Sequence, residues 1–324
     1  MNLDPPYHVL ADLLIKGRLV PFLGAGASLR EDSDETLSQS SSESLPSAKE
    51  LADLLARELG IDANEIGAHS LLEVALYYEL CAGRLYLQSK LRSIFLHAYR
   101  PGSLHRFLAN LPNPILIVTT NYDRLLEQAF LAQDKPYHLV VTPIALPECE
   151  KKVLWWKHND NRPTIISPDE LDLSLKDTSI IFKIHGSVDP NSDEFDSFVV
   201  SEEDYFEMAG RYFQRTLVPP CIYGHLAKSH IVFLGYSLRD IHMRHVVRQM
   251  RLGLRHFAIA KSMSKFESYM WRALKIDAYE ISIQEFIEAL RVEGERLSTV
   301  YTPPQHPDGT VHKTKAEAEA AEHH

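Results

Sequence analysis

The sequence has little cysteine and no long apolar segment. Its three cysteines, Cys81, Cys149 and Cys221, lie far apart and include no C-x-x-C pair. Neither a disulfide framework nor a four-cysteine zinc site can be built from them, so we expect no metal and a reducing, cytoplasmic setting. No apolar run is long enough to span a bilayer, and the N-terminal MNLDPPYHVL lacks the basic and apolar regions of a secretion signal. We therefore expect no contact with membranes.

Positive charge is also scarce. Lys and Arg number 34 against 44 Asp and Glu, and the formal net charge is -10. A surface that binds DNA or RNA needs clustered basic residues, so we expect no direct contact with nucleic acid. The hydrophobic content of 45% is ordinary for a globular protein, and 324 residues suffice for a substantial core.

Short apolar, β-branched runs, each followed by small or polar residues, recur along the chain. Runs this short and continuous are typical of strands buried on both faces, as in a parallel sheet. Helical patterns lie between them, and two of these begin with capping boxes, at Ser47 with Glu50 and at Ser282 with Glu285. This alternation predicts an α/β fold with a Rossmann-like, doubly wound parallel sheet. The predicted strands are Leu19–Leu23, Ile115–Val118, Ile180–Ile184, Ile231–Leu234, His256–Ala260 and Ile276–Ile281.

The region after the first predicted strand has helical patterns but no strand. We therefore expect a small helical subdomain, at about residues 45–105, inserted into a domain of residues 1–300. Residues 30–44 are acidic and serine-rich, which predicts a loop, and the polar residues 301–324 predict a disordered tail. In GRYFQRT, Arg211 and Arg215 share one helical face, which we expect to be solvated.

The segment LVPFLGAGASLR carries Gly24, Ala25 and Gly26 directly after the first predicted strand. Glycines at such a place let the backbone approach a pyrophosphate closely, and successive N–H groups make an anion-binding nest. The dinucleotide pattern G-x-G-x-x-G is incomplete, because its third glycine would fall at Leu29. From these residues alone, a plain structural turn stays open as the alternative.

Three more predicted strands end in polar or small residues. In TTNYD, Asn121 and Asp123 follow the second strand, and Asp123 could equally cap the next helix. His185 precedes Gly186 after the third strand, and Gly235 begins a GYS turn after the fourth. Ligands bind at the carboxyl ends of the strands in a parallel α/β sheet, so we expect these turns to meet around one ligand.

With these turns the chain resembles the sirtuin-like NAD-consuming proteins. The family pattern is a G-A-G-x-S loop, a T-Q-N-x-D turn, a histidine–glycine pair and a G-x-S turn. Here the corresponding segments are GAGAS, TTNYD, HG and GYS, in the same order over roughly residues 18–260. Thr120 stands where the family often has glutamine. The four-cysteine zinc ribbon of the family's protein deacylases is missing.

The segments TNYD, HGS, VVSEEDY and GYSLRD look most like the bacterial sirtuin-like NAD hydrolases of anti-phage defence. This resemblance implies a NAD glycohydrolase that releases nicotinamide and ADP-ribose. It implies a partner such as a hexameric ATPase or an Argonaute-like protein, and we also expect a homo-oligomer. A non-catalytic sensor of NAD or an NAD-derived nucleotide stays an alternative, and a NAD-dependent protein deacylase is a weaker one.

If NAD is the ligand, two side chains are the expected catalytic residues. Asn121 would hold the attacking water through its carbonyl oxygen and contact ribose hydroxyls through its amide, while His185 would accept a proton. Asp123 would orient the nicotinamide carboxamide, as the resemblance implies, and Ser28 would contact the pyrophosphate. The residues expected to bind NAD are Gly24, Ala25, Gly26, Ser28, Thr120, Asp123, Gly235 and Ser237.

Overall fold

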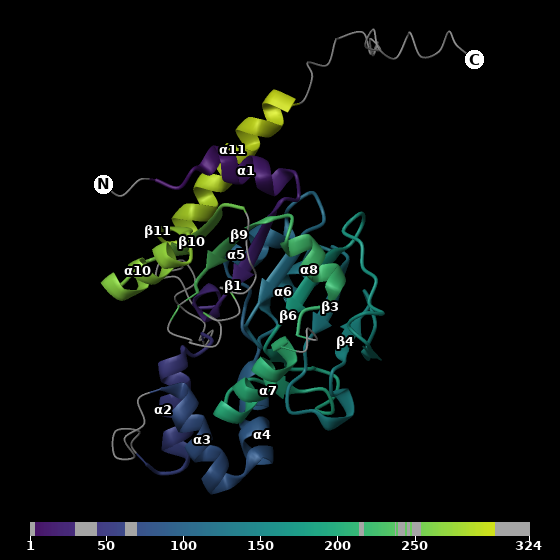
Figure 1. The fold of residues 1–324 in the computed structure, drawn as a ribbon, viewed down its shortest axis with the longest axis vertical. Coiled ribbons are helices and arrows are strands. Elements are labelled where there is room, and N and C mark those ends of the chain that lie inside the picture. Colours follow the sequence, from purple (N-terminus) through teal and green to yellow (C-terminus); the bar gives the residue numbers. More distant parts are fainter. Residues whose placement is uncertain are drawn as a thin grey trace, which may run out of the picture.

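The structure is a computed structural model that describes residues 4–29, 44–61, 70–213, 217–236, 238, 244, 247 and 254–301. Figure 1 shows one twisted sheet with helices on both faces and a separate group of helices beyond one end of the strands. Residues 30–43 of the expected loop, and the expected tail from residue 302, lie outside the described residues.

The central sheet has the strand order β11-β10-β9-β1-β2-β6-β3-β4-β5. The strands from β11 to β3 run parallel, and β4 and β5 extend the sheet antiparallel. All six predicted strands are present in the parallel part, which confirms the Rossmann-like α/β fold; the sheet also contains β3, β4 and β5, which are not among those six. The bounds are β1 (Leu19–Leu23), β2 (Leu116–Thr119), β3 (Tyr137–Val141), β4 (Val153–Trp156), β5 (Thr164–Ile166), β6 (Ser179–Lys183), β9 (His230–Leu234), β10 (His256–Ala260) and β11 (Ile276–Glu280).

Helices cover both faces of this sheet. Alternate strand residues enter opposite cores, as Phe22 and Leu23 do in β1, and both are fully buried. Each such side chain contributes roughly 1.5–3 kcal/mol to folding. One core contains α1 (Tyr7–Ile15), α5 (Ser103–Ala109), α6 (Leu125–Ala132) and α11 (Ile283–Tyr301). The other contains α7 (Glu202–Phe213), α8 (Pro220–Leu226) and α10 (Lys265–Ala273).

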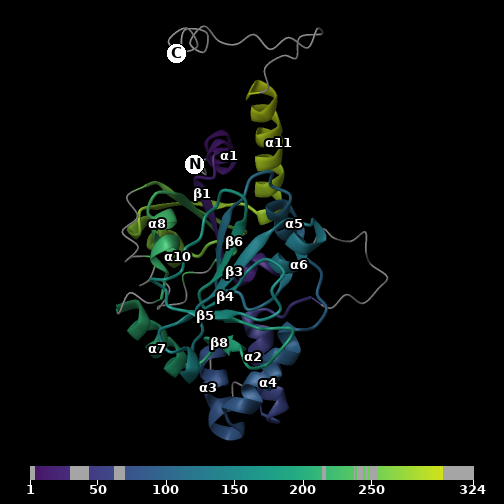
Figure 2. The same ribbon diagram turned by 90° about the vertical axis from the view of Figure 1, so that its right-hand side faces the viewer.

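A third core belongs to α2 (Ala48–Glu58), α3 (Leu71–Ala82) and α4 (Arg84–Phe95), which we call the helical subdomain. The predicted capping box at the start of α2 is present: Ser47 N donates to Glu50 Oε2 at 2.7 Å and Glu50 N donates to Ser47 Oγ at 3.3 Å. Figure 2 shows the subdomain next to β8 (Ser197–Phe198), which pairs with β7 (Gly186–Ser187). Phe198 and Tyr122 pack into the subdomain core and join it to the sheet.

The expectation of a solvated helix face around Arg211 is wrong. Arg211 lies on α7 with only 4% of its surface exposed, and its guanidinium donates to the carbonyl oxygens of Pro143 and Lys152. Burial lowers the pKa of Arg211. These carbonyls belong to segments about 60 residues earlier in the chain, which a helical pattern does not reveal. Arg215 lies outside the described residues.

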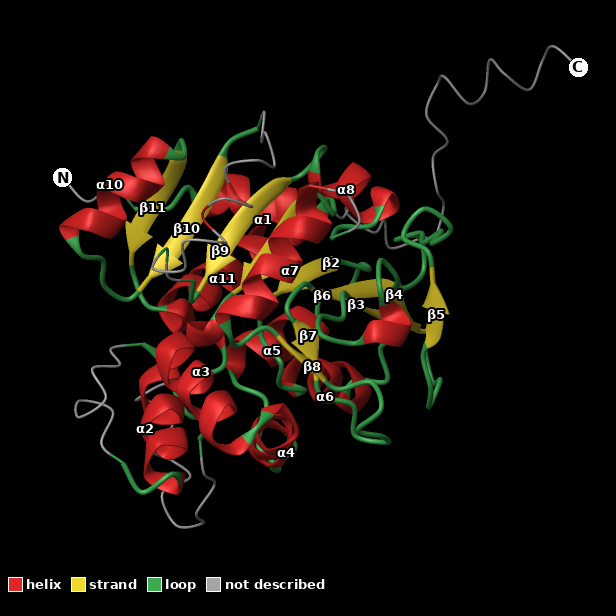
Figure 3. Cartoon of the chain, turned by 60° about the horizontal axis from the view of Figure 1, so that its bottom comes forward, coloured by secondary structure: helices red, strands yellow, loops and turns green. Residues whose placement is uncertain are grey.

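The chain reverses its direction of travel across the sheet at β1. From β1 it proceeds to β2 and β6 on one side, and later returns past β1 to β9, β10 and β11 on the other. Figure 3 shows the strands β9, β10 and β11 pointing toward the side that carries the helical subdomain. Such a reversal leaves a crevice at the carboxyl ends of the strands, where α/β proteins bind ligands. Within the described ranges, no helix has the length and apolar character that a membrane crossing needs.

Candidate functional site

A cavity of about 1140 Å³ lies at this crevice, between the strand ends and the helical subdomain. Thr119 and Lys183 are register partners on the adjacent strands β2 and β6. Asn121 and His185, each two residues further along, therefore leave the sheet side by side and line the same cavity. The expected site residues that line it are Gly24, Ala25, Gly26, Thr120, Asn121, Asp123, His185 and Gly235.

The glycines after β1 and β9 allow two turns to pack backbone against backbone. Gly26 N donates to Gly235 O at 2.9 Å. A Cβ on Gly24 would lie 2.6 Å from Gly235 O, and a Cβ on Gly235, whose φ is +61°, would lie 2.2 Å from Ala27 N. No side chain fits at these contacts. The structural-turn interpretation of these glycines is thus supported, while the turn also forms one wall of the cavity.

The expected nest of backbone N–H groups is smaller than the sequence predicts. The amides of Gly24, Gly26, Ala27 and Ser28 all donate to backbone carbonyl oxygens within the protein. Among the hydrogen bonds described for this loop, none uses Ala25 N. The loop therefore allows a phosphate to approach closely, but four of its amides are already bonded within the protein.

The amide of Asn121 is held by two hydrogen bonds. Its Nδ2 donates to Gly24 O at 3.1 Å and to Ser28 Oγ at 2.9 Å. Ser28 Oγ donates in turn to Asp123 Oδ2 at 2.8 Å. Because the hydroxyl proton goes to the carboxylate, Ser28 must accept from Asn121, which fixes the orientation of the amide. The carbonyl oxygen Oδ1 is therefore the group that Asn121 presents to the cavity, and its amide is not available for ribose hydroxyls.

Asp123 has the structural role that its sequence position allowed. Its Oδ1 accepts a hydrogen bond at 3.0 Å from the N–H of Leu125, the first residue of α6, although the N-cap position itself is Arg124. The side chain is 5% exposed, and Ser28, at 7%, does not line the cavity. Ser28 thus lies behind Asn121, where it orients the amide, instead of at the cavity surface as predicted. Ser237 lies outside the described residues.

His185 is held between the sheet and α7. It is 4% exposed, and its ring meets Tyr205 edge-on, with the ring centres 5.8 Å apart. The backbone O of His185 accepts from Val199 N at 3.2 Å. Gly186 has φ +87°, and a Cβ there would lie 2.1 Å from Ser197 O. The glycine after His185 is therefore required for the pairing of β7 with β8.

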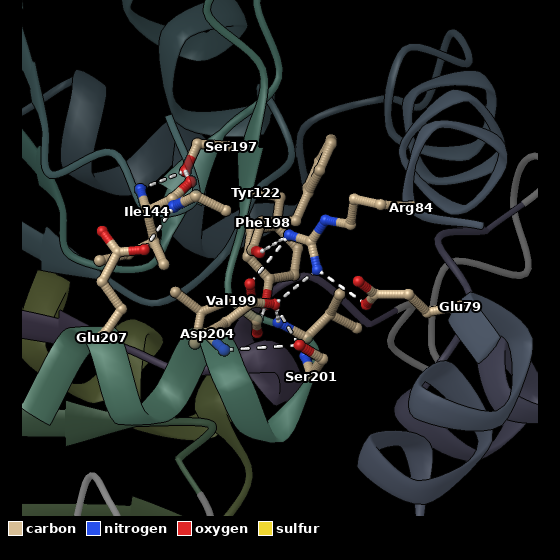
Figure 4. A network of polar contacts seen from close by, with 12 residues as sticks. Glu79, Arg84, Tyr122, Ile144, Ser197, Phe198, Val199, Ser201, Asp204 and Glu207 are labelled. Carbon is tan, nitrogen blue, oxygen red and sulfur yellow. Dashed lines mark hydrogen bonds and ion pairs between the residues drawn. The ribbon is translucent and has the colours of Figure 1, made fainter. Parts of the chain in front are cut away.

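An ion pair joins the helical subdomain to α7 (Figure 4). Arg84 Nη1 donates to Asp204 Oδ2 at 3.0 Å, and Nη2 donates to Phe198 O at 3.1 Å. Burial lowers the pKa of Arg84, but Asp204 and Glu79 more than offset this, so the net shift is upward. Tyr122 completes the link, since its hydroxyl donates to Val199 O. Sequence reasoning missed these contacts: Arg84 lies in no pattern that singles it out, and Tyr122 and Asp204, although they lie within TTNYD and VVSEEDY, were given no role there.

The far end of the cavity was also missed from the sequence. It is formed by the segments that follow β10 and β11, by Glu267 and Trp271 of α10, and by the first turn of α11. Both helices begin with capping boxes, in which Glu267 N donates to Ser264 Oγ and Glu285 N donates to Ser282 Oγ, each at 3.2 Å. The second of these boxes was predicted. The residues that line this end are Lys261, Ser262, Met263, Glu267, Trp271, Ser282, Ile283, Gln284 and Glu285.

The described parts of the chain contain no group of three or more His, Cys, Asp or Glu side chains arranged to hold a metal ion. The model of the SIR2-like domain family matches residues 115–279, which is half of the chain. This match covers Asn121, His185 and Gly235 but begins after the glycine loop of β1. A search of curated proteins gives no match.

Proposed function

Since this chain belongs to the SIR2-like family and the family uses NAD, we propose that it is a NAD glycohydrolase that releases nicotinamide and ADP-ribose. One observation carries the proposal: Asn121 and His185 follow adjacent strands and line one cavity, which the glycine turns after β1 and β9 also line. The cavity wall runs from β6 to the segment after β11. At ~4.8 Å per strand spacing this is roughly 24 Å, enough for an extended dinucleotide.

The chemistry of the bond explains the choice of side chains. Nicotinamide leaves as a neutral pyridine from a cationic substrate, so its departure needs no general acid. The protein has to stabilise positive charge on the ribose and to place a water molecule. Asn121 Oδ1 can accept a hydrogen bond from that water, because the amide is fixed by Gly24 O and Ser28. His185 lies where it can accept the proton that the water loses.

The residues that line the cavity support one orientation of NAD within it. With the nicotinamide ribose at Asn121 and His185, the pyrophosphate meets the β1 turn, where Gly24 allows close approach. The adenosine half then extends toward the first turns of α10 and α11. The buried carboxylate of Asp123 lies on the nicotinamide side, and its charge favours a cationic ring there.

We also propose that the activity belongs to a cytoplasmic anti-phage system and is controlled by assembly. An unrestrained NAD hydrolase would harm its host, so contacts with other copies or with a partner ATPase or Argonaute-like protein would set the activity. Exposed apolar side chains at the α3–α4 hairpin support an assembly surface: Leu80, Leu85 and Tyr86 are 77%, 79% and 70% exposed.

The test is to incubate the full chain with NAD, alone and with the product of a neighbouring gene, and to separate the products by chromatography. Nicotinamide together with ADP-ribose supports the proposal, while cyclic ADP-ribose would show that an internal atom outcompetes water. Binding of NAD without cleavage in every condition would favour a sensor. Release of nicotinamide only in the presence of an acylated peptide would favour a deacylase.

A further inference from the structure

A buried ion pair lies directly behind the turn that carries Asn121. Lys183, the last residue of β6, pairs with Glu127 of α6, with 2.7 Å between Nζ and Oε1. Both side chains are 1% exposed, and neither lines the cavity. A charged pair so deep in the protein is unusual, because water must be removed from both groups.

The ammonium of Lys183 contacts three further groups. Nζ donates to the backbone O of Asp123, lies 3.4 Å from the backbone O of Tyr122, and donates to Ser187 Oγ at 3.1 Å. The first two groups belong to the turn that follows Asn121, and the third belongs to β7, two residues after His185. Lys183 therefore donates hydrogen bonds to both segments that carry the proposed catalytic residues, the turn after β2 and the segment after β6.

Stability alone does not account for this arrangement. Replacement of a buried ion pair by apolar residues of similar size is often neutral or stabilising. An apolar side chain cannot, however, donate hydrogen bonds to carbonyl oxygens. Lys183 Nζ binds the backbone of the turn through the carbonyl oxygen of Asp123, while Ser28 binds the side chains of Asn121 and Asp123. Removal of Lys183 would therefore release the backbone of the turn and leave the Ser28 hydrogen bonds in place.

We propose that Lys183 is a positioning residue, oriented by Glu127, that sets the turn so that Asn121 Oδ1 faces His185. This inference rests on the proposed function, because it assigns Lys183 a part in that same reaction. A displacement of ~1 Å at the reacting groups costs about 100-fold in rate. We expect loss of the Lys183 contacts to lower kcat ~10- to 100-fold and to leave KM for NAD within ~3-fold.

The test compares two double variants of the full chain. K183M/E127L removes both charges together, because a single change would leave one charge buried and alone. R92M/D196L is the matched control: Arg92 and Asp196 form an ion pair at 2.6 Å, with Asp196 5% exposed, and neither lines the cavity. For each variant, thermal unfolding, steady-state nicotinamide release and hydrogen exchange of the peptide that spans residues 119–125 are measured.

We expect K183M/E127L to fold with a Tm near that of the unaltered chain, to show the drop in kcat, and to exchange faster in residues 119–125 only. The control should keep its kcat. A folded K183M/E127L variant with unaltered kcat and exchange would overturn the inference. If the unaltered chain itself releases no nicotinamide, the proposed function fails, and the exchange comparison still decides whether Lys183 positions the turn. Slower catalysis in both double variants would also overturn it, because the effect would then not be specific to Lys183.

Discussion

The substitution Ser28→Ala separates two roles of this serine. A serine that contacts the pyrophosphate of NAD would mainly affect binding, so its loss would raise KM. In the structure Ser28 lies behind Asn121 instead, accepting from Asn121 Nδ2 at 2.9 Å and donating to Asp123 Oδ2 at 2.8 Å. Its loss should therefore lower kcat and leave KM nearly unchanged.

The magnitude follows from these two hydrogen bonds. The bond to Asp123 involves a charged acceptor in a buried place, and such a bond contributes ~1.5–3 kcal/mol to stability. The variant should thus remain folded with a measurably lower Tm. Asn121 keeps one of the two bonds that orient its amide, the one to Gly24 O. We expect a fall in kcat of ~10- to 100-fold, as for a modest displacement of a positioned group.

The assay is steady-state release of nicotinamide at several NAD concentrations, with Ser179→Ala as the control. Ser179, the first residue of β6, is also a buried serine, and its Oγ accepts from Ile115 N at 3.1 Å, but it does not line the cavity. The control should therefore change kcat less than ~3-fold. A raised KM with unaltered kcat in Ser28→Ala would refute the reasoning and restore a direct contact between Ser28 and NAD.

Three further outcomes are expected. Asn121→Ala and His185→Ala should each lower nicotinamide release by ~10²- to 10⁴-fold while circular dichroism shows an intact fold, and rates like those of the unaltered chain in either would remove that residue from the mechanism. Gly17 and Gly235 both have positive φ, but a Cβ meets nothing within 4 Å at Gly17 and Ala27 N at 2.2 Å at Gly235. Denaturant unfolding should show a cost of ~1 kcal/mol for Gly17→Ala and ~1–3 kcal/mol more for Gly235→Ala, and equal costs would contradict the close packing of the two turns. Burial lowers the pKa of His256 to about 4 from its ordinary 6.5. The unfolded chain then binds this proton more readily, so the associated stability, roughly 3 kcal/mol, is present above pH 6.5 and is lost as the pH falls toward 4. His256→Asn keeps an acceptor for Ile231 N, and unfolding at pH 7 and pH 4.5 should show a smaller acid loss than in the unaltered chain.

The sequence predicted the elements whose cause is local. The strands of the parallel sheet are buried on both faces, so each is a short run of apolar residues that can be recognised without its neighbours. The capping boxes that begin α2 and α11 involve residues three positions apart, which is also local. By contrast β3, with the sequence YHLVV, contains a polar residue and is only partly buried, so its pattern gave no such signal.

The sequence also predicted which strand ends meet, because parallel strands of one sheet place their carboxyl ends along one edge. This rule groups Asn121, His185 and Gly235 from the sequence alone, and all three line one cavity. What the side chains do within that group was less predictable. Asn121 was expected to use its amide on the ribose, yet the amide is bound to Gly24 and Ser28.

By itself, then, the sequence determined six parallel strands of the α/β sheet, the polar or glycine-containing turns that follow four of them, and the edge on which those turns meet, since each follows from patterns of a few residues. Only the tertiary structure decided that Ser28 orients Asn121, that Arg211 is buried, and that Lys183 lies behind the Asn121 turn. These roles depend on partners distant in the chain, 95 residues from Ser28 to Asp123 and 60 from Lys183 to Asp123. The linear sequence does not show which group a polar side chain will bind, because burial and hydrogen bonding are set only when the strands and helices pack.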